Sequence, residues 1–168
     1  EAAKQGARDA ILALGPVAPV PKPSADKRKG GEVALWHMTD WQTAKVSPSY
    51  NSGVARERVM RFCDKAIKIT QMQRSNHPVD HCVIMFGGDL VEGLWNFPTQ
   101  AHEVDQTLFG QFVTVSRLMV DVVRIALANH KTVQVVAEPG NHGRLGNRRD
   151  CIPKSDNLDR ITAELARQ

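Results

Sequence analysis

Cysteine is scarce in this sequence, and its three cysteines form no recognisable pattern. Cys63, Cys82 and Cys151 lie far apart without a Cys-x-x-Cys pair, which excludes a disulfide framework and a cysteine zinc site. No apolar run approaches the roughly 20 residues that span a bilayer, so a transmembrane protein is excluded. Residues 1–15 lack the pattern of a secretory signal. Together these absences predict a cytoplasmic protein with no membrane partner.

The composition is that of an ordinary globular chain. The chain has 168 residues, of which 42% are hydrophobic and 24% charged, enough for one core of ordinary size. A net charge of +4 weakly favours an anionic partner. The first residue is Glu1 rather than Met, and the final residues have a helical pattern. We therefore expect the chain to be a piece of a longer polypeptide.

The chain divides into two parts of different composition. Residues 1–31 are Ala-rich at first and then rich in Pro and Lys, which predicts a helix and a flexible linker, a candidate tether to a larger assembly. Residues 32–168 alternate between short apolar runs and longer helical patterns. The expected strands are residues 33–38, 81–86 and 132–137, and the expected helices are 54–73, 102–129 and 157–167. This order predicts an α/β domain with a mostly parallel sheet and helices on its faces.

Polar residues follow each expected strand at the point where the strand ends. Asp40 follows the first, Asp89 the second, and Asn141 with His142 the third. Because the carboxyl ends of parallel strands meet at one edge of a sheet, these side chains are expected to converge there. Oxygen donors with few nitrogens and no thiolates suit a divalent cation such as Mn²⁺, Mg²⁺ or Zn²⁺.

At these positions the sequence resembles the calcineurin-like metallophosphoesterase superfamily. That family has the motifs D-x-H, G-D-x-x-(D/E) and G-N-H-(D/E), each after a strand. This chain has D-x-Q at residues 40–42, GGDLVEG at 87–93 and GNHG at 140–143. Its HMTDWQTA segment, residues 37–44, is most similar to the opening motif of SbcD-type DNA exonucleases. The resemblance covers residues 33–143 and implies the first part of the family's α/β sandwich.

The resemblance also implies a role for each matching residue. Asp40 would bind a first metal ion, Asp89 would bridge two ions, and Asn141 would bind the second. The two divalent ions, Mn²⁺ in first place, would activate a water molecule as the nucleophile. His142 would stand near the leaving-group oxygen as a proton donor or electrostatic stabiliser. On this basis Asp40, Asp89 and His142 are the expected catalytic residues.

Two departures from the family pattern bear on this expectation. Gln42 stands where the family has a histidine, and an amide oxygen binds Zn²⁺ or Mn²⁺ less tightly than imidazole does. The later histidines that complete the family's metal sites are also missing, because no histidine follows His142. We expect those ligands to lie beyond residue 168 if the chain is a fragment, and a weakened metal site otherwise.

Several other residues have two open interpretations each. Arg144, Arg148 and Arg149 follow the third motif and either bind phosphate oxygens or form a solvated basic loop. Trp41 either stacks on a base or fills the edge of the core. Glu92 is expected to hold its loop by hydrogen bonds rather than to bind metal. Other expectations concern His37, packed in the core; His130, on the surface; and Glu103 with Asp105, capping the second long helix.

The function that these observations predict is metal-dependent hydrolysis of a phosphodiester, with DNA as the favoured substrate. A phosphomonoesterase that acts on phosphoprotein or nucleotide uses the same metal motifs, so the motifs do not separate the two. Gln42 and the missing histidines also leave open a binding or scaffold module that kept the fold without the metals.

Overall fold

The computed structural model describes residues 30–146 and 156–167 and confirms an α/β fold with a three-stranded parallel sheet flanked by helices. Its elements are β1 (Val33–Met38), α2 (Ser52–Gln73), β2 (His81–Phe86), the 3₁₀ turn η1 (Gln100–His102), α3 (Leu108–Asn129), β3 (Thr132–Ala137) and α4 (Leu158–Arg167). The predicted N-terminal helix and most of the predicted linker lie outside the described residues, as do Arg148, Arg149 and Cys151. None of the described helices is long and apolar enough to cross a bilayer.

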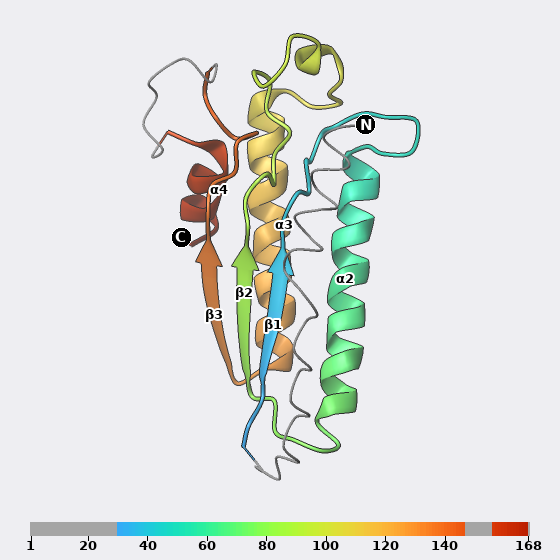
Figure 1. The fold of residues 1–168 in the computed structure, drawn as a ribbon, viewed down its shortest axis with the longest axis vertical. Helices are drawn as coiled ribbons and strands as arrows, with labels where there is room; N and C mark the ends of the chain where they lie inside the picture. The colour runs from blue at the N-terminus through green and yellow to red at the C-terminus, as the bar shows by residue number, and fades with distance from the viewer. Residues whose placement is uncertain (1–29, 147–155, 168) are drawn as a thin grey trace, which may run out of the picture.

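The strands lie in the order β1-β2-β3 and are parallel throughout (Figure 1). They are in register at their ends, where Met38 pairs with Phe86 and Phe86 pairs with Ala137. All three strands therefore end at the same side of the sheet, which we call the carboxyl-terminal edge. The loops that begin there carry the three motifs, so the topology brings the candidate residues to one end of the molecule.

The core lies on one face of this sheet. Side chains alternate between the faces of a strand, and the buried set includes Trp36, Ile84 and Phe86. Helix α3 lies behind the sheet between α2 and α4, and its buried residues complete the core (Figure 1). On the opposite face Leu35 is 59% and Met85 38% exposed. Within the described residues, the helices therefore cover one face of the sheet rather than both.

Helix α3 begins six residues later than the sequence pattern predicts. The side chain of Thr107 caps it by accepting a hydrogen bond from the Gly110 backbone N–H at 3.1 Å. The predicted capping by Glu103 and Asp105 is wrong. Asp105 instead accepts hydrogen bonds from the backbone and hydroxyl of Ser52, 53 residues away in sequence, and so anchors its loop to the start of α2.

Two histidines are placed opposite to expectation. His37 is exposed because its position in β1 points to the uncovered face of the sheet. His130 is buried, with its ring edge-on to Trp36 at 5.9 Å between centroids and its Nδ1 3.0 Å from the Ala126 carbonyl oxygen. Hydropathy alone does not predict the burial of either residue. The burial of His37 depends on which face of the sheet its side chain occupies, and that of His130 depends on its contact with Trp36.

Candidate functional site

The three motif loops lie side by side at the carboxyl-terminal edge. The loop after β1 joins the loop after β2 through four backbone hydrogen bonds, among them those from Asp40 N to the Gly88 oxygen at 3.1 Å and from Gln42 N to the Asp89 oxygen at 2.9 Å. The loop after β3 joins the same β2 loop where the backbone N–H of His142 donates to Asp89 Oδ1 at 2.7 Å. The predicted convergence of the three motifs is therefore seen in the backbone.

The loops after β2 and β3 approach so closely that only glycine fits at the contact. A Cβ added to Gly140 would lie 2.1 Å from Asp89 Oδ1, and one added to Gly88 would lie 2.3 Å from the Gly140 nitrogen. Both distances are far inside van der Waals contact. The two glycines therefore allow Asp89 to lie directly against the GNH motif.

Strained backbone is concentrated at the same edge. The four non-glycine residues with positive φ in the described chain are Asp40 (55°), Gln42 (41°), Ala44 (84°) and Asp89 (52°). Side chains make this region costly, by about 1–3 kcal/mol for each residue, and such residues cluster at functional sites. Aspartate tolerates the region better than most residues, but glutamine and alanine have no such preference. The strain is therefore concentrated in the same loops that carry the candidate residues.

A carboxylate that the sequence argument did not single out holds two of the loops together. Asp159, at the start of α4, accepts backbone hydrogen bonds from Asp89, Leu90 and Val91 in the β2 loop and from Gly140 in the β3 loop, at 2.9–3.3 Å. Asp159 is only 3% exposed to solvent. Burial raises the pKa of the Asp159 carboxyl above its usual value, and the four N–H groups oppose that rise.

Asn157 supports the same arrangement. Its amide nitrogen donates to the Gly140 oxygen, and its amide oxygen accepts from the backbone N–H of Asp159, both at 2.8 Å. We call the set formed by Asn157, Asp159 and the backbone groups they bind the α4 clamp. The only signal for it in the sequence is a pair of turn-forming residues just before a short amphipathic helix, which does not reveal its distant partners.

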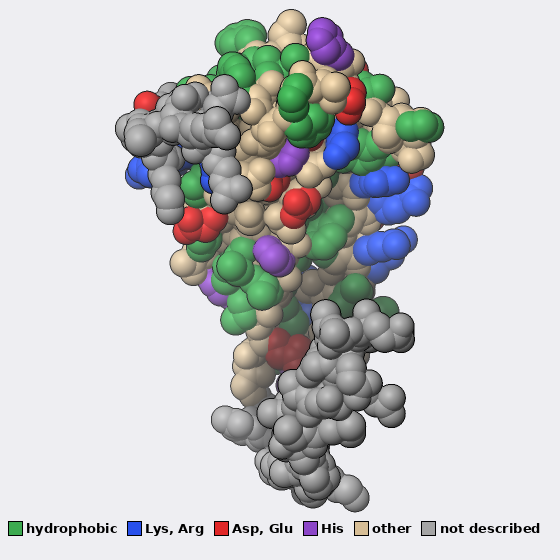
Figure 2. Space-filling view, turned by 45° about the horizontal axis from the view of Figure 1, so that its top comes forward, with side chains coloured by type: hydrophobic (Ala, Val, Ile, Leu, Met, Phe, Trp, Pro, Cys, Tyr) green, Lys and Arg blue, Asp and Glu red, His purple; other side chains and the backbone are tan. Residues whose placement is uncertain are grey.

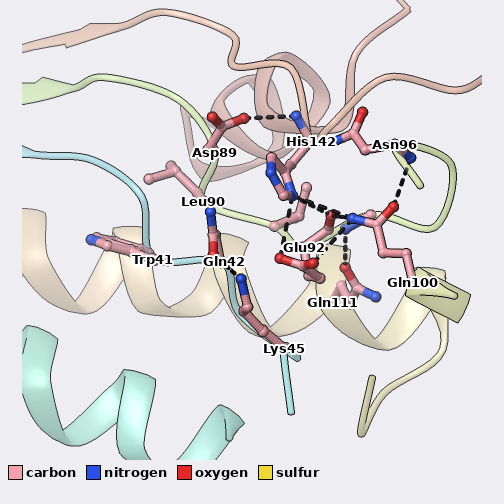
Figure 3. Close-up of polar contacts among 12 residues, drawn as sticks. Trp41, Gln42, Lys45, Asp89, Leu90, Glu92, Asn96, Gln100, Gln111 and His142 are labelled. Atoms are coloured by element: carbon pink, nitrogen blue, oxygen red, sulfur yellow. Dashed lines mark hydrogen bonds and ion pairs between the residues drawn. The ribbon is translucent and has the colours of Figure 1, made fainter. Parts of the chain in front are cut away.

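His142 is held by a buried glutamate (Figure 3). Its Nδ1 lies 2.9 Å from the Glu92 carbonyl oxygen and 3.2 Å from Glu92 Oε2, which has no other partner among the described residues. Glu92 is 0% exposed. Gln100 Nε2 lies farther from Nδ1, at 3.3 Å, and donates to both the carbonyl and the carboxyl oxygen of Glu92. The closer acceptors place the proton on Nδ1 and leave Nε2 as the free ring nitrogen.

Two buried glutamines hold the loop that carries Glu92. Gln100 accepts from the backbone N–H of Asn96 at 2.7 Å, and Gln111 on α3 accepts from that of Gly93 at 2.8 Å. Both side chains are completely buried. The expectation that Glu92 takes part in hydrogen bonding within its loop is confirmed, and its contact with His142 is an addition that the sequence pattern did not predict.

The candidate metal ligands present a partial set of oxygen donors. Asp40 is exposed and uses Oδ2 to accept from the Thr39 hydroxyl at 2.8 Å, while Asp89 uses Oδ1 to accept from His142. The remaining carboxyl oxygens and the exposed Asn141 amide accept no hydrogen bond within the described residues. No group of three His, Cys, Asp or Glu residues in this part of the chain could hold a metal ion. Two carboxylates and an amide suit a cation that keeps several waters, such as Mg²⁺ or Mn²⁺.

Gln42 is not turned toward this donor set. Its amide oxygen accepts a hydrogen bond from Lys45 Nζ at 3.0 Å, and in Figure 3 the Gln42 side chain lies away from the Asp89 carboxylate. Its role as a metal ligand stays a prediction, and it requires this contact to break. Nothing in the sequence pattern indicated that Lys45 occupies the Gln42 oxygen, because the contact depends on side-chain conformation.

The candidate substrate residues are placed differently from one another. Trp41 is only 6% exposed and packs edge-on against Phe86, with 5.6 Å between ring centroids, so it fills the edge of the core and offers no open face to a base. Arg144 is exposed directly after the GNH motif, where its backbone pairs with Asn157.

Comparisons of the chain with models of known protein families, with curated proteins and with solved structures find no match.

Proposed function

We propose that this chain is the catalytic part of a divalent-metal-dependent phosphodiester hydrolase, of the kind that the SbcD-like motifs imply, with DNA as its substrate. The observation that carries the proposal is the pairing of His142 with buried Glu92 directly beside Asp89. A histidine oriented by a carboxylate next to a second, solvent-accessible carboxylate is an arrangement suited to proton transfer at a charged reaction centre.

In this proposal Asp40, Asp89 and the Asn141 amide hold the cations, and their uncommitted oxygens provide the ligands. When bound, the cations supply positive charge that stabilises the charge developing on the phosphate oxygens. Arg144 contacts a non-reacting phosphate oxygen from the rim of the site. The α4 clamp fixes Asp89 and the GNH motif before substrate arrives, so that little reorganisation accompanies the reaction.

His142 acts as the proton donor. In its doubly protonated form, His142 gives its Nε2 proton to the leaving oxygen as water attacks phosphorus and the bond to that oxygen breaks. The attacking water loses one proton to solvent, and Nε2 takes up a proton from solvent for the next turnover. Glu92 orients the ring for this step, because its carbonyl oxygen lies 2.9 Å and its carboxylate 3.2 Å from Nδ1. Glu92 is therefore a positioning residue, since it acts through His142 rather than on the substrate.

Hydrolysis of bis(p-nitrophenyl) phosphate in the presence of Mn²⁺ tests the proposal. Asp89→Asn keeps the acceptor for His142 N–H but removes the negative charge, and we expect kcat/KM to fall by about 100-fold or more, equivalent to roughly 2.7 kcal/mol. Asp64→Asn, an exposed carboxylate on α2, is the matched control and should stay within about twofold of the original rate, as a surface change. Equal rates in Mn²⁺ and in EDTA, or an unimpaired Asp89→Asn variant, would contradict the proposal. Faster turnover of p-nitrophenyl phosphate would indicate a phosphomonoesterase instead.

A second candidate function is a non-catalytic binding module, and the Gln42–Lys45 contact favours it. With Gln42 held by Lys45, only two carboxylates and one amide remain for cations. Isothermal titration with Mn²⁺ separates the candidates independently of turnover. Mn²⁺ binding that is lost in Asp89→Asn supports the hydrolase. Absence of binding by the folded chain at millimolar Mn²⁺ supports the non-catalytic binding module.

A further inference from the structure

A cleft opens beside Asp40, between the loop after β1 and helix α2. Its volume is about 540 Å³, which is the size of a small-ligand pocket rather than of a groove for a duplex. Besides Asp40 and Gln42 from the candidate site, its lining includes Lys45, Tyr50, Arg58 and Phe62. One wall of the cleft therefore belongs to the proposed reaction centre, and the other presents cations and aromatic rings.

Arg58 has donors available within this cleft. Its guanidinium lies over the Tyr50 ring, 5.0 Å from the centroid, and it forms no ion pair among the described residues. Stacking on a ring fixes the plane of the guanidinium and leaves its edge free for the two oxygens of a phosphate. The Tyr50 hydroxyl donates to the Trp41 carbonyl oxygen, so the ring itself is anchored to the loop after β1.

Helix α2 continues this positive charge away from the cleft. Arg58, Arg61, Lys65 and Lys68 are exposed and follow the helical spacing that places them on one side of α2, and we call them the basic stripe. The stripe extends over about 15 Å at 1.5 Å per residue. Figure 2 shows Lys and Arg side chains gathered on the side of the molecule where α2 lies. Helix α2 begins near the carboxyl-terminal edge and runs away from it, so Arg58 is the stripe residue nearest that edge and Lys68 is the farthest (Figure 1).

The basic stripe carries net positive charge that acidic neighbours on α2 do not neutralise. Helix α2 has five basic and two acidic residues in 22 positions, a net charge of +3, whereas the whole chain of 168 residues has +4. Within the stripe, Arg61 pairs with Glu57 at 2.8 Å, but both side chains are 65% exposed. Such an exposed pair contributes little and exchanges readily for another anion.

We propose that the cleft and the basic stripe bind a single strand of nucleic acid and lead its phosphates to the carboxyl-terminal edge. The stripe binds the backbone by charge, Arg58 holds the phosphate at the mouth of the cleft, and the rings of Tyr50 and Phe62 provide contact surface for an unpaired base. The destination of the strand rests on the proposed function, but its binding does not, because no metal takes part in it.

Fluorescence anisotropy of a labelled single-stranded DNA 20-mer in EDTA tests the binding site without hydrolysis. The variant Arg58→Gln/Lys65→Gln/Lys68→Gln should lower the magnitude of the slope of log Kobs against log[salt] by about 2, at roughly 0.7 for each lost phosphate contact. The control Arg117→Gln/Arg124→Gln/Arg160→Gln removes three exposed arginines from α3 and α4 and should leave the slope unchanged. Equal slopes for the two variants, or no salt-dependent binding by the original chain, would overturn the proposal.

Two further arms fix the identity of the ligand. A duplex of the same length that binds more tightly than the single strand would overturn the single-strand assignment. Poly-L-glutamate that competes equally per charge would identify an acidic protein surface as the ligand instead of nucleic acid. The small diester reporter keeps the two proposals apart, because Lys65 and Lys68 do not line the cleft beside Asp40. Weaker DNA binding with unchanged reporter hydrolysis in Lys65→Gln/Lys68→Gln supports both proposals. Normal DNA binding without any reporter hydrolysis contradicts only the hydrolase.

Discussion

The carboxyl-terminal edge has two halves that differ in how their polar groups are held. In the half formed by the β2 and β3 loops, which we call the clamped half, Glu92, Asn157 and Asp159 are buried and bind backbone or His142. In the half formed by the β1 loop and the start of α2, the open half, Asp40 and Arg58 are exposed. The open half is joined to its neighbour mainly through backbone hydrogen bonds.

The difference separates two tasks. Groups that transfer protons or hold cations at fixed distances need a site whose geometry exists before substrate arrives, and buried hydrogen bonds provide it. Groups that receive a long, charged substrate need exposure and room to adjust. The clamped half therefore fits proton transfer and one side of the cation site, and the open half adds Asp40 to the cation site and Arg58 to substrate binding, as proposed above. Substitutions in the two halves should accordingly change different measured quantities.

The largest effect is expected from Asp159→Ala in the clamped half. The substitution leaves four backbone N–H groups without their acceptor, and each buried unsatisfied donor costs about 1–3 kcal/mol. Partial hydration reduces the sum, so we expect the free energy of unfolding to fall by about 3–5 kcal/mol, as for other broken buried networks. Urea denaturation followed by circular dichroism measures it.

The matched control for this change is Glu164→Ala on the same helix, an exposed carboxylate whose loss should cost less than about 0.5 kcal/mol. If Asp159→Ala were as stable as that control, the β2 and β3 loops would not depend on α4, and the clamped half would lose its distinction from the open half.

A smaller effect is expected from Glu92→Gln, which keeps the size of the side chain and removes its charge. An amide accepts from Nδ1–H less strongly than a carboxylate does, so the ring is held less firmly and reporter kcat should fall by about 10- to 100-fold, within the usual contribution of general acid catalysis. KM should change by less than about twofold, because Glu92 does not touch the substrate. A merely structural role for Glu92 would lower the free energy of unfolding and leave the kcat of the folded protein unchanged.

Glu138→Gln, an exposed carboxylate at the end of β3, serves as the comparison for Glu92→Gln and should alter neither kcat nor KM. An equal fall of kcat in both variants would assign the effect to the overall charge of the edge rather than to the Glu92–His142 pair.

The smallest effect is expected from Gln42→His in the open half. Imidazole binds Mn²⁺ better than an amide oxygen does, and histidine tolerates the positive φ of this position. We expect Mn²⁺ affinity, measured by isothermal titration, to rise about tenfold, equivalent to ~1.4 kcal/mol. Gln71→His on α2 should not change it. Unaltered affinity in Gln42→His would mean that the open half takes no part in cation binding.

The parts of the fold that follow regular sequence patterns could be predicted. The parts that depend on contacts between distant residues could not. The strands at 33–38, 81–86 and 132–137 are short, mostly apolar runs that are followed within three residues by Gly or Asp, and each forms where the pattern places it. The start of α3 was misplaced because residues 102–107 are polar and compatible with either a helix or a loop. Their loop structure follows from contacts such as that of Asp105 with Ser52, which no local pattern contains.

The candidate site was predictable to the same extent. Strand-end position is a property of the chain order, so Asp40, Asp89 and the GNH motif were expected at one edge. Asp159 was not, because its four partners are up to 70 residues away and an aspartate at a helix start has an ordinary local explanation. The contact between Gln42 and Lys45 depends on rotamers within one loop, which the residue types alone do not determine.

The position of Asp159 in the chain has a consequence for biosynthesis. A nascent polypeptide that has emerged as far as Ala137 already contains all three strands and their shared hydrophobic core, but not yet the carboxylate that receives the N–H groups of the second loop. The three strands therefore precede the carboxylate that joins the loops after β2 and β3 in the order of synthesis. The α4 clamp closes only after residue 159 has emerged, so a product truncated at Ala137 lacks both the clamp and the part of the core that α4 contributes.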